Sequence, residues 1–181
     1  MLETIPLSYS TVVALATIVA IVAALALRHI RRIPHRRIQR LRRRYLPLVG
    51  RVWPRALADK TEHRNEHVAR VDADVATVVD ALRKADFAPN PFSTLKYRTV
   101  DGDRQYSLLS WRYVESPTAR RQLHVYAFRN SRGGLDLYAH EERSWSDSPT
   151  EHMSETNQVA GDPDGKLRQA LDDAYIEVSE V

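Results

Sequence analysis

The sequence predicts an α+β protein in which a single N-terminal transmembrane helix precedes a small domain. That domain is expected to hold a four-stranded antiparallel meander flanked by helices, in the order α-β-β-β-β-α. Three observations predict this arrangement: an apolar run, then apolar residues at helical spacing, then alternating residues separated by short turns. The expected segments are a short N-terminus (1–9), a membrane span (10–27), a basic connector (28–55) and a soluble domain (56–181).

The apolar run from Thr11 to Leu27 contains no charged residue, no Gly and no Pro. With Ser8 to Ser10 it forms a stretch that, as a helix rising about 1.5 Å per residue, reaches roughly 30 Å, the hydrocarbon thickness of a bilayer. The stretch lacks the basic start and the small-residue cleavage site of a signal peptide. A retained single-pass span is therefore predicted.

A polybasic segment follows, in which nine of the 17 residues from Arg28 to Arg44 are arginine and none is acidic. Because arginine beside a span marks the cytoplasmic end, the N-terminus is predicted outside and the C-terminal domain in the cytoplasm, or inside the virion if the membrane is viral. Apolar residues at near-helical spacing predict a basic amphipathic helix, interrupted or restarted at Pro34, that binds anionic lipid headgroups. The predicted membrane-surface residues are Arg28, Arg31, Arg32, Arg36, Arg37, Arg40, Arg42, Arg43 and Arg44.

Two other interpretations of the arginines remain open at this point. They would also neutralise nucleic-acid phosphates, or they would only fix the orientation of the span. The lipid surface is preferred because the positive charge is concentrated beside the predicted span, whereas residues 51–181 carry 18 Lys and Arg against 22 Asp and Glu.

The segment after the arginines is predicted to be a hinge, because Pro47, Gly50 and Pro54 interrupt regular structure. From Asp59 to Phe87 apolar residues recur at steps of three and four, which predicts a helix. In an alternative interpretation, Asp72 or Asp74 caps a separate second helix.

Alternating residues after Asn90 predict strands over 93–100, 104–114, 122–128 and 135–141. Asp101-Gly102-Asp103 is a strong hairpin signal, and residues 130–134 form a second glycine-bearing turn. Short connections require antiparallel pairing, which predicts the meander. An irregular loop over 144–161 and a final helix over 164–177 complete the domain.

The composition excludes several kinds of site. Without cysteine the chain has no disulfides, no thiolate chemistry and no Cys-based zinc site. A phosphate-binding glycine loop and a G-x-S-x-G elbow are both absent from the sequence. Asp162-Pro163-Asp164-Gly165 is a poor calcium loop and is better explained as a turn that begins a helix. No cofactor is therefore expected.

The clearest enzymatic pattern is His63-Arg64-Asn65-Glu66-His67, an H-x-x-E-H string of the kind found in inverted zinc proteases. On a helix, His63 and His67 would share a face and bind zinc, Glu66 would activate water, and Glu141 or Glu142 would be a third ligand. The string lies in a polar stretch that cannot enclose a metal. A solvated helix face is therefore the preferred interpretation.

Aromatic residues on the predicted strands offer a possible binding face, although ordinary core packing also explains them. Its candidate residues are Tyr106, Trp111, Tyr113, Tyr126 and Phe128. The leading hypothesis is a membrane-anchored interaction or structural protein whose domain holds a protein partner at the bilayer. A nucleic-acid-binding module is the alternative, because arginines and aromatic rings on an open sheet also bind RNA. A metal-dependent hydrolase is the third.

Overall fold

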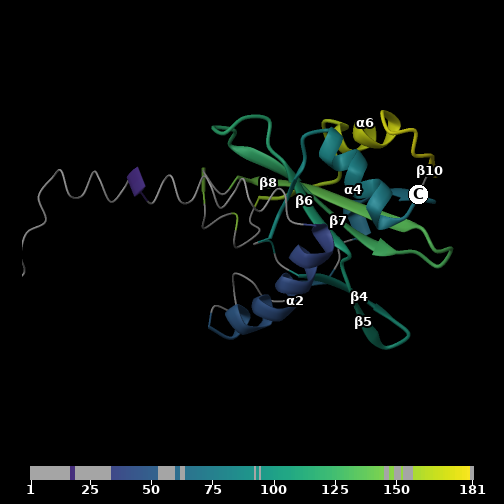
Figure 1. The fold of residues 1–181 in the computed structure, drawn as a ribbon, viewed down its shortest axis with the longest axis horizontal. Coiled ribbons are helices and arrows are strands. Elements are labelled where there is room, and N and C mark those ends of the chain that lie inside the picture. Colours follow the sequence, from purple (N-terminus) through teal and green to yellow (C-terminus); the bar gives the residue numbers. More distant parts are fainter. Residues whose placement is uncertain are drawn as a thin grey trace, which may run out of the picture. The chain divides into compact units, whose positions relative to one another are not determined.

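The computed structural model describes residues 17–18, 34–52, 60–61, 64–91, 93, 95–144, 147–148, 152 and 157–179 (Figure 1). The chain divides into two compact units, Met1–Pro34 and His35–Val181. Of the first unit, only Thr17, Ile18 and Pro34 are described. All further elements belong to the second unit.

A seven-stranded antiparallel sheet organises the described part of the second unit. Its order is β10-β2-β8-β7-β6-β3, and β9 pairs with β8 beside this path. The longest strands, β7 and β8, have nine residues each and form the centre. The strands are β2 (His67–Val71), β3 (Ala88–Pro89), β6 (Leu109–Tyr113), β7 (Arg121–Arg129), β8 (Leu135–Arg143), β9 (Val159–Ala160) and β10 (Val178–Ser179).

One face of this sheet is apolar and is covered by α4 (Val75–Lys84) and α6 (Lys166–Asp172). The two helices lie side by side in Figure 1. Side chains alternate across a strand, so every second residue of β7 and β8 enters this core. The fully buried side chains of the core include Val78, Leu82, Val125, Ala127, Leu135, Leu137, Leu167 and Leu171.

The opposite face carries polar and aromatic side chains beneath a second layer. That layer includes α2 (His35–Val52), the short 3-10 helix η1 (Arg64–Glu66) and a three-stranded sheet. In the small sheet, β1 (Lys60–Thr61) runs parallel to β4 (Lys96–Val100), which pairs antiparallel with β5 (Asp103–Tyr106). Arg98 fastens β4 to the large sheet, because its guanidinium lies 5.1 Å from the ring centre of Phe128 and 3.1 Å from Asp136 Oδ2.

Two local predictions are confirmed. Asp101 and Gly102 form the tight turn between β4 and β5, with φ of 52° and 89°, as the twist of a two-residue hairpin requires. Asp74 caps α4, and its carboxylate accepts a hydrogen bond from the Thr77 amide at 2.8 Å.

The predicted four-stranded meander is wrong. In the described part of the chain, β6, β7 and β8 pair in chain order and form the middle of the larger sheet, whereas β4 and β5 pair with each other in the small sheet. The predicted strand over 104–114 divides at Ser107 and Leu108, whose amides donate to Lys96 O and Ala127 O. These bonds hold the two halves in different sheets.

The predicted helix over Asp59 to Phe87 is wrong in its first half, where the chain forms β1, η1 and β2. Val68 and Val71 are both buried although they are three residues apart, because a bulge shifts the register between His67 and Ala69. A bulged strand therefore produced the spacing that favours a helix.

The prediction of a single-pass membrane protein with a cytoplasmic domain is corrected as well. No helix in the described part of the chain combines the length and the apolar character that crossing a bilayer requires. At 18 residues α2 approaches the length, but its arginines exclude it from hydrocarbon. Apart from Thr17 and Ile18, which are helical, the predicted span over 10–27 lies outside the described residues.

From His35 onward, the basic segment belongs to the same compact unit as the sheet. Its helix begins at His35, directly after Pro34, and it continues through Pro47 and Gly50 to Val52. The predicted interruption at Pro47 and Gly50 is therefore wrong. A proline removes one amide donor, which an 18-residue helix held by tertiary contacts tolerates.

Candidate functional site

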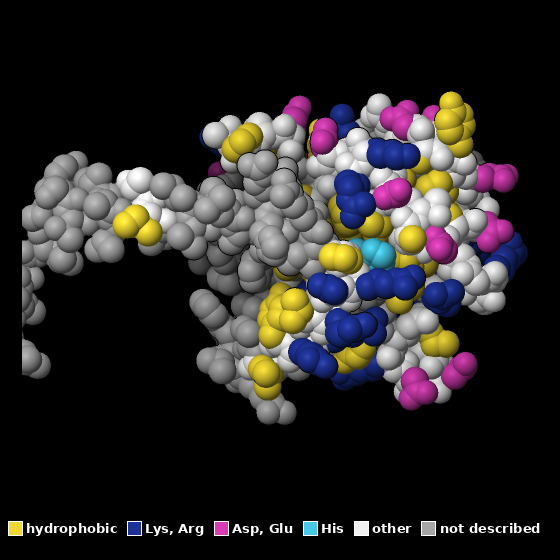
Figure 2. All heavy atoms as spheres, in the orientation of Figure 1, with side chains coloured by type: hydrophobic (Ala, Val, Ile, Leu, Met, Phe, Trp, Pro, Cys, Tyr) yellow, Lys and Arg dark blue, Asp and Glu magenta, His cyan; other side chains and the backbone are white. Residues whose placement is uncertain are grey.

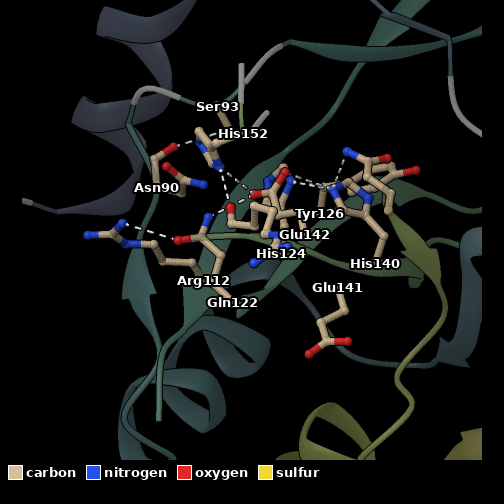
Figure 3. A network of polar contacts seen from close by, with 12 residues as sticks. Asn90, Ser93, Arg112, Gln122, His124, Tyr126, His140, Glu141, Glu142 and His152 are labelled. Carbon is tan, nitrogen blue, oxygen red and sulfur yellow. Dashed lines mark hydrogen bonds and ion pairs between the residues drawn. The ribbon is translucent and has the colours of Figure 1, made fainter. Parts of the chain in front are cut away.

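A buried polar cluster occupies the sheet face opposite α4 and α6. It consists of Glu66, Ser110, Gln122, His124, Tyr126, His140 and Glu142. Antiparallel pairing places His124 beside His140 and Gln122 beside Glu142. Directly opposed residues have Cβ atoms about 5 Å apart, so the register of β7 and β8 brings these side chains into contact (Figure 3).

His140 is the charged centre of the polar cluster. Its Nδ1 lies 3.2 Å from Glu66 Oε2, and its Nε2 lies 3.4 Å from Glu142 Oε2. Burial would lower the pKa of His140, but the contacts with Glu142 and Glu66 outweigh burial and raise it to about 9. Burial would likewise raise the pKa of Glu142, yet the neighbouring histidines lower it to about 2. An imidazolium thus lies between two carboxylates.

His124 connects the polar cluster to α2. Its Nε2 lies 2.8 Å from Ser110 Oγ, which lies 2.5 Å from Ser93 Oγ. Arg42 Nη2 donates to the same Ser93 hydroxyl at 2.7 Å. Burial, followed by the charge of His140, lowers the pKa of His124 well below its ordinary value. This imidazole is therefore neutral.

A second feature lies on the surface, between α2 and the N-terminus of α4. This arginine groove has a volume of about 550 Å³. Among the described residues, five guanidinium groups line it, and Asp74 supplies the single carboxylate. Figure 2 shows dark blue side chains gathered over this part of the molecule. The lining residues are His35, Arg36, Gln39, Arg40, Arg43, Arg44, Asp74, Val75, Ala76, Leu108 and Arg129.

The positive charge of the arginine groove is only partly offset by its described lining, in which Asp74 interacts electrostatically with Arg36. Within the described ranges, no carboxylate forms an ion pair with Arg36, Arg40, Arg43 or Arg44. Burial, then the charges of Arg36 and Arg83, lowers the pKa of His35, so this imidazole adds no charge at neutral pH. By contrast, a hollow of about 310 Å³ near β7 is lined by three basic and four acidic residues.

The predicted membrane-surface arginines separate into three groups: those outside the described residues, those exposed on α2, and Arg42, which is buried. Arg28, Arg31 and Arg32 lie outside the described residues. The members of this set with exposed side chains on α2 are Arg36, Arg37, Arg40, Arg43 and Arg44.

Arg42 alone of the described α2 arginines is fully buried, and it donates to Gln39 Oε1 at 2.9 Å and to Ser93. Leu41, one of the apolar residues whose spacing predicts the amphipathic helix, is 53% exposed.

The five predicted aromatic residues do not form one surface. Trp111 is buried in the core beneath α4, and Tyr113 packs beside it against Phe87. Tyr126 and Phe128 are buried on the opposite face of the sheet. Tyr106 lies on β5 in the small sheet, where it contacts Tyr97.

The H-x-x-E-H string does not form an α-helix where it is described, because Arg64–Glu66 is the short 3-10 helix η1 and a strand follows. His67 begins β2, and its ring stacks on Tyr138 with centroids 4.8 Å apart, whereas His63 lies outside the described residues. Glu66 enters the polar cluster, so it is not the solvated residue that was expected. Glu142, a candidate third ligand, enters it too.

Sequence reasoning missed His124 and His140 as a pair. One sequence signal could have found them. On two predicted strands joined by a short turn, polar and aromatic residues recur at every second position, as His124-x-Tyr126 and as Tyr138-x-His140-x-Glu142. Polar residues at every second position predict a polar face on a strand. Because such a face normally points to solvent, the pattern does not reveal that α2 covers this one.

Comparison of the chain with models of protein families, with curated proteins and with solved structures gives no match. Function is therefore inferred from the arginine groove and the polar cluster.

Proposed function

We propose that this chain is a nucleic-acid-binding module that grips the phosphate backbone with its arginine groove. The observation that carries the proposal is the presence of five guanidinium groups against one carboxylate among the described residues that line a single groove. A guanidinium donates two parallel hydrogen bonds to a phosphate, which makes arginine the preferred residue for this contact. Because these arginines lack carboxylate partners among the described residues, a phosphate does not have to displace one.

The spacing of the arginines favours a polymer over a single phosphate. Arg36, Arg40 and Arg44 recur every four residues on α2, which places them about 6 Å apart along the helix axis. Such a row matches a ligand with regularly repeated negative charges. The α4 N-terminus lies at the side of the groove, where the helix dipole also favours negative charge.

The groove is expected to contact phosphates without reading the bases. The part of its lining that the structure describes contains no Phe, Tyr or Trp, so these residues offer no platform on which unpaired bases stack. Phosphate contacts position a protein on a duplex but carry little sequence information. A preference for duplex over single strand, with little sequence dependence, follows.

The groove supports this function better than it supports the protein-partner hypothesis. That hypothesis drew on an open aromatic face, and Trp111, Tyr126 and Phe128 are buried. A lipid headgroup presents phosphate as well, so anionic vesicles belong in the test.

The test measures binding of the full-length chain to a fluorescein-labelled DNA duplex by fluorescence anisotropy over a range of salt concentrations. Each arginine-phosphate contact contributes about −0.9 to the slope of log K against log salt, so the arginines predict a slope between about −3 and −5. An acidic polymer without phosphate, polyglutamate, is expected to bind more weakly than the duplex.

A matched pair of double variants separates the groove from general charge. Arg40→Gln/Arg43→Gln removes two groove arginines, whereas Arg120→Gln/Arg132→Gln removes two other exposed arginines. The groove variant should lose about two units of slope and at least about 10-fold in affinity, and the control should bind like the wild type. Equal losses in both variants contradict the proposal, as does binding to phosphatidylglycerol vesicles without binding to the duplex.

A further inference from the structure

We infer that His124, His140 and Glu142 bind one divalent metal ion of the zinc class between β7 and β8. His124 Nδ1 lies 3.3 Å from His140 Nε2, which lies 3.4 Å from Glu142 Oε2. All three donor atoms lie within 4.8 Å of one another. In a tetrahedral zinc site with bonds of about 2.0 to 2.1 Å, neighbouring donors are separated by about 3.3 Å.

The far side of each proposed ligand is held by another residue. His124 Nε2 contacts Ser110 Oγ at 2.8 Å, His140 Nδ1 contacts Glu66 Oε2 at 3.2 Å, and Glu142 Oε1 accepts from Gln122 Nε2 at 2.8 Å. Metal-binding histidines usually donate their other N–H to a carboxylate or another oxygen, which fixes the tautomer and aims the free lone pair at the metal. In the cluster, Ser110 and Gln122 form hydrogen bonds with His124 and Glu142, and the Glu66 carboxylate lies within ion-pair distance of His140. Figure 3 labels Gln122, His124, His140 and Glu142.

The three donor atoms that face one another, His124 Nδ1, His140 Nε2 and a carboxylate oxygen of Glu142, require a positive charge between them. With the outer nitrogens of both rings acting as donors, His124 Nδ1 and His140 Nε2 present lone pairs toward each other and toward a carboxylate. These side chains are only 1%, 0% and 3% exposed, so water does not screen the repulsion. Either a proton on His140 or a metal ion provides the charge, and a metal ion satisfies all three atoms at once.

Two imidazoles and one carboxylate suit zinc and its neighbours better than magnesium or calcium, which prefer oxygen ligands. The carboxamide nitrogen of Gln158 lies 3.3 Å from His140 Nε2. The nitrogen and oxygen of an amide exchange places by rotation, so Gln158 is a candidate fourth ligand. An ion held here would cross-link the two central strands, which indicates a structural role.

The test uses the full-length chain after treatment with a chelator and dialysis. Co²⁺ should produce the visible d-d absorption of a tetrahedral site at one ion per chain, and Zn²⁺ should abolish that absorption. Zn²⁺ should also raise the melting temperature. Glu66→Gln should weaken Zn²⁺ binding by about 10- to 100-fold, because Glu66 orients His140.

His124→Gln should abolish the Co²⁺ absorption and the thermal shift, whereas His35→Gln should leave both unchanged. Far-UV circular dichroism checks that each variant is folded. If His124→Gln does not fold, the Co²⁺ absorption spectrum of the wild-type protein decides whether the site exists. Wild-type protein without d-d absorption and without a thermal shift overturns the inference, and the cluster is then held by a proton. A shift of equal size in folded His124→Gln also overturns it.

Discussion

Asp136 shows how one buried carboxylate joins three strands. From β8 it accepts from Arg70 Nε of β2 at 2.9 Å and from Arg98 Nη1 of β4 at 3.1 Å. Burial would raise the pKa of Asp136, but the hydrogen bonds from Arg70 and Arg98 more than offset burial, so the pKa lies below its ordinary value. The carboxylate therefore stays charged at neutral pH and holds the small sheet on the large one.

Asp136→Asn is expected to lower the free energy of unfolding by about 2 kcal/mol at neutral pH, since hydrogen bonds to a charged group are lost. The folded-state pKa is depressed, so the stabilisation is complete above the unfolded-state value of about 3.9 and is lost as the pH falls through the folded-state value. Urea unfolding of wild type and variant from neutral to acidic pH checks this. A difference in stability that does not shrink at low pH would contradict it.

Residue-level prediction from the sequence succeeded where local chemistry decides and failed where packing decides. The cap at Asp74 and the positive φ at Gly102 depend on neighbouring residues, and both were predictable. The burial of Arg42 instead of Leu41 depends on Ser93, which is remote in sequence. Nothing in the basic run marks one arginine as buried.

At the scale of elements, α2 is held to the sheet by a polar contact as much as by apolar packing. Ile38, Arg42 and Tyr45 recur on one side of the helix, and the hydroxyl of Tyr45 donates to Pro91 O. Four neighbouring exposed arginines, Arg36, Arg40, Arg43 and Arg44, line the arginine groove. Substitutions at Arg42 and Arg43, which are adjacent in sequence, should therefore separate the attachment of α2 from the binding of a duplex.

Arg42→Ala should destabilise the protein by about 2 to 3 kcal/mol, because buried partners of a charged group are left without it. It should also speed hydrogen exchange along α2. Arg43→Ala should change stability by less than about 0.5 kcal/mol while weakening duplex binding. If the two variants unfold at the same urea concentration, α2 is not attached as described.

Gly134 ends the turn between β7 and β8 close to the backbone of β2. A Cβ there would lie 2.2 Å from Val71 O, a backbone atom that cannot rotate away. Gly134→Ala is expected to cost about 1 to 3 kcal/mol. As the control, a Cβ at Gly133 would meet no atom within 4 Å, so Gly133→Asn would bear only the strain of a positive φ of 94°, which asparagine tolerates better than most residues. Its thermal unfolding should therefore change less than that of Gly134→Ala.

The elements that sequence predicted well are those with a strong local pattern. Alternation located β7 and β8, and the turn residues located the hairpin between β4 and β5. The two-residue strands β3, β9 and β10 carry no such pattern and exist through pairing with distant strands. The division between β5 and β6 likewise depends on Ala127, which is remote from Leu108 in sequence.

At the scale of the whole molecule, the large sheet separates two environments. Its apolar face forms the core with α4 and α6, and its other face holds the polar cluster beneath α2 and β4. The sequence identified the basic run, but it gave no sign that Arg129 and the start of α4 would lie beside it. The polar cluster and the arginine groove both depend on contacts between residues that are remote in sequence, so neither could be predicted from local patterns.

Hydrogen-deuterium exchange of the full-length chain, with and without a saturating DNA duplex, tests the central claim most directly. The account predicts slower exchange in α2 and at the start of α4, around Asp74 to Ala76, with no change at the β4-β5 turn. Protection confined to that turn or to α6, with α2 unchanged, would contradict it.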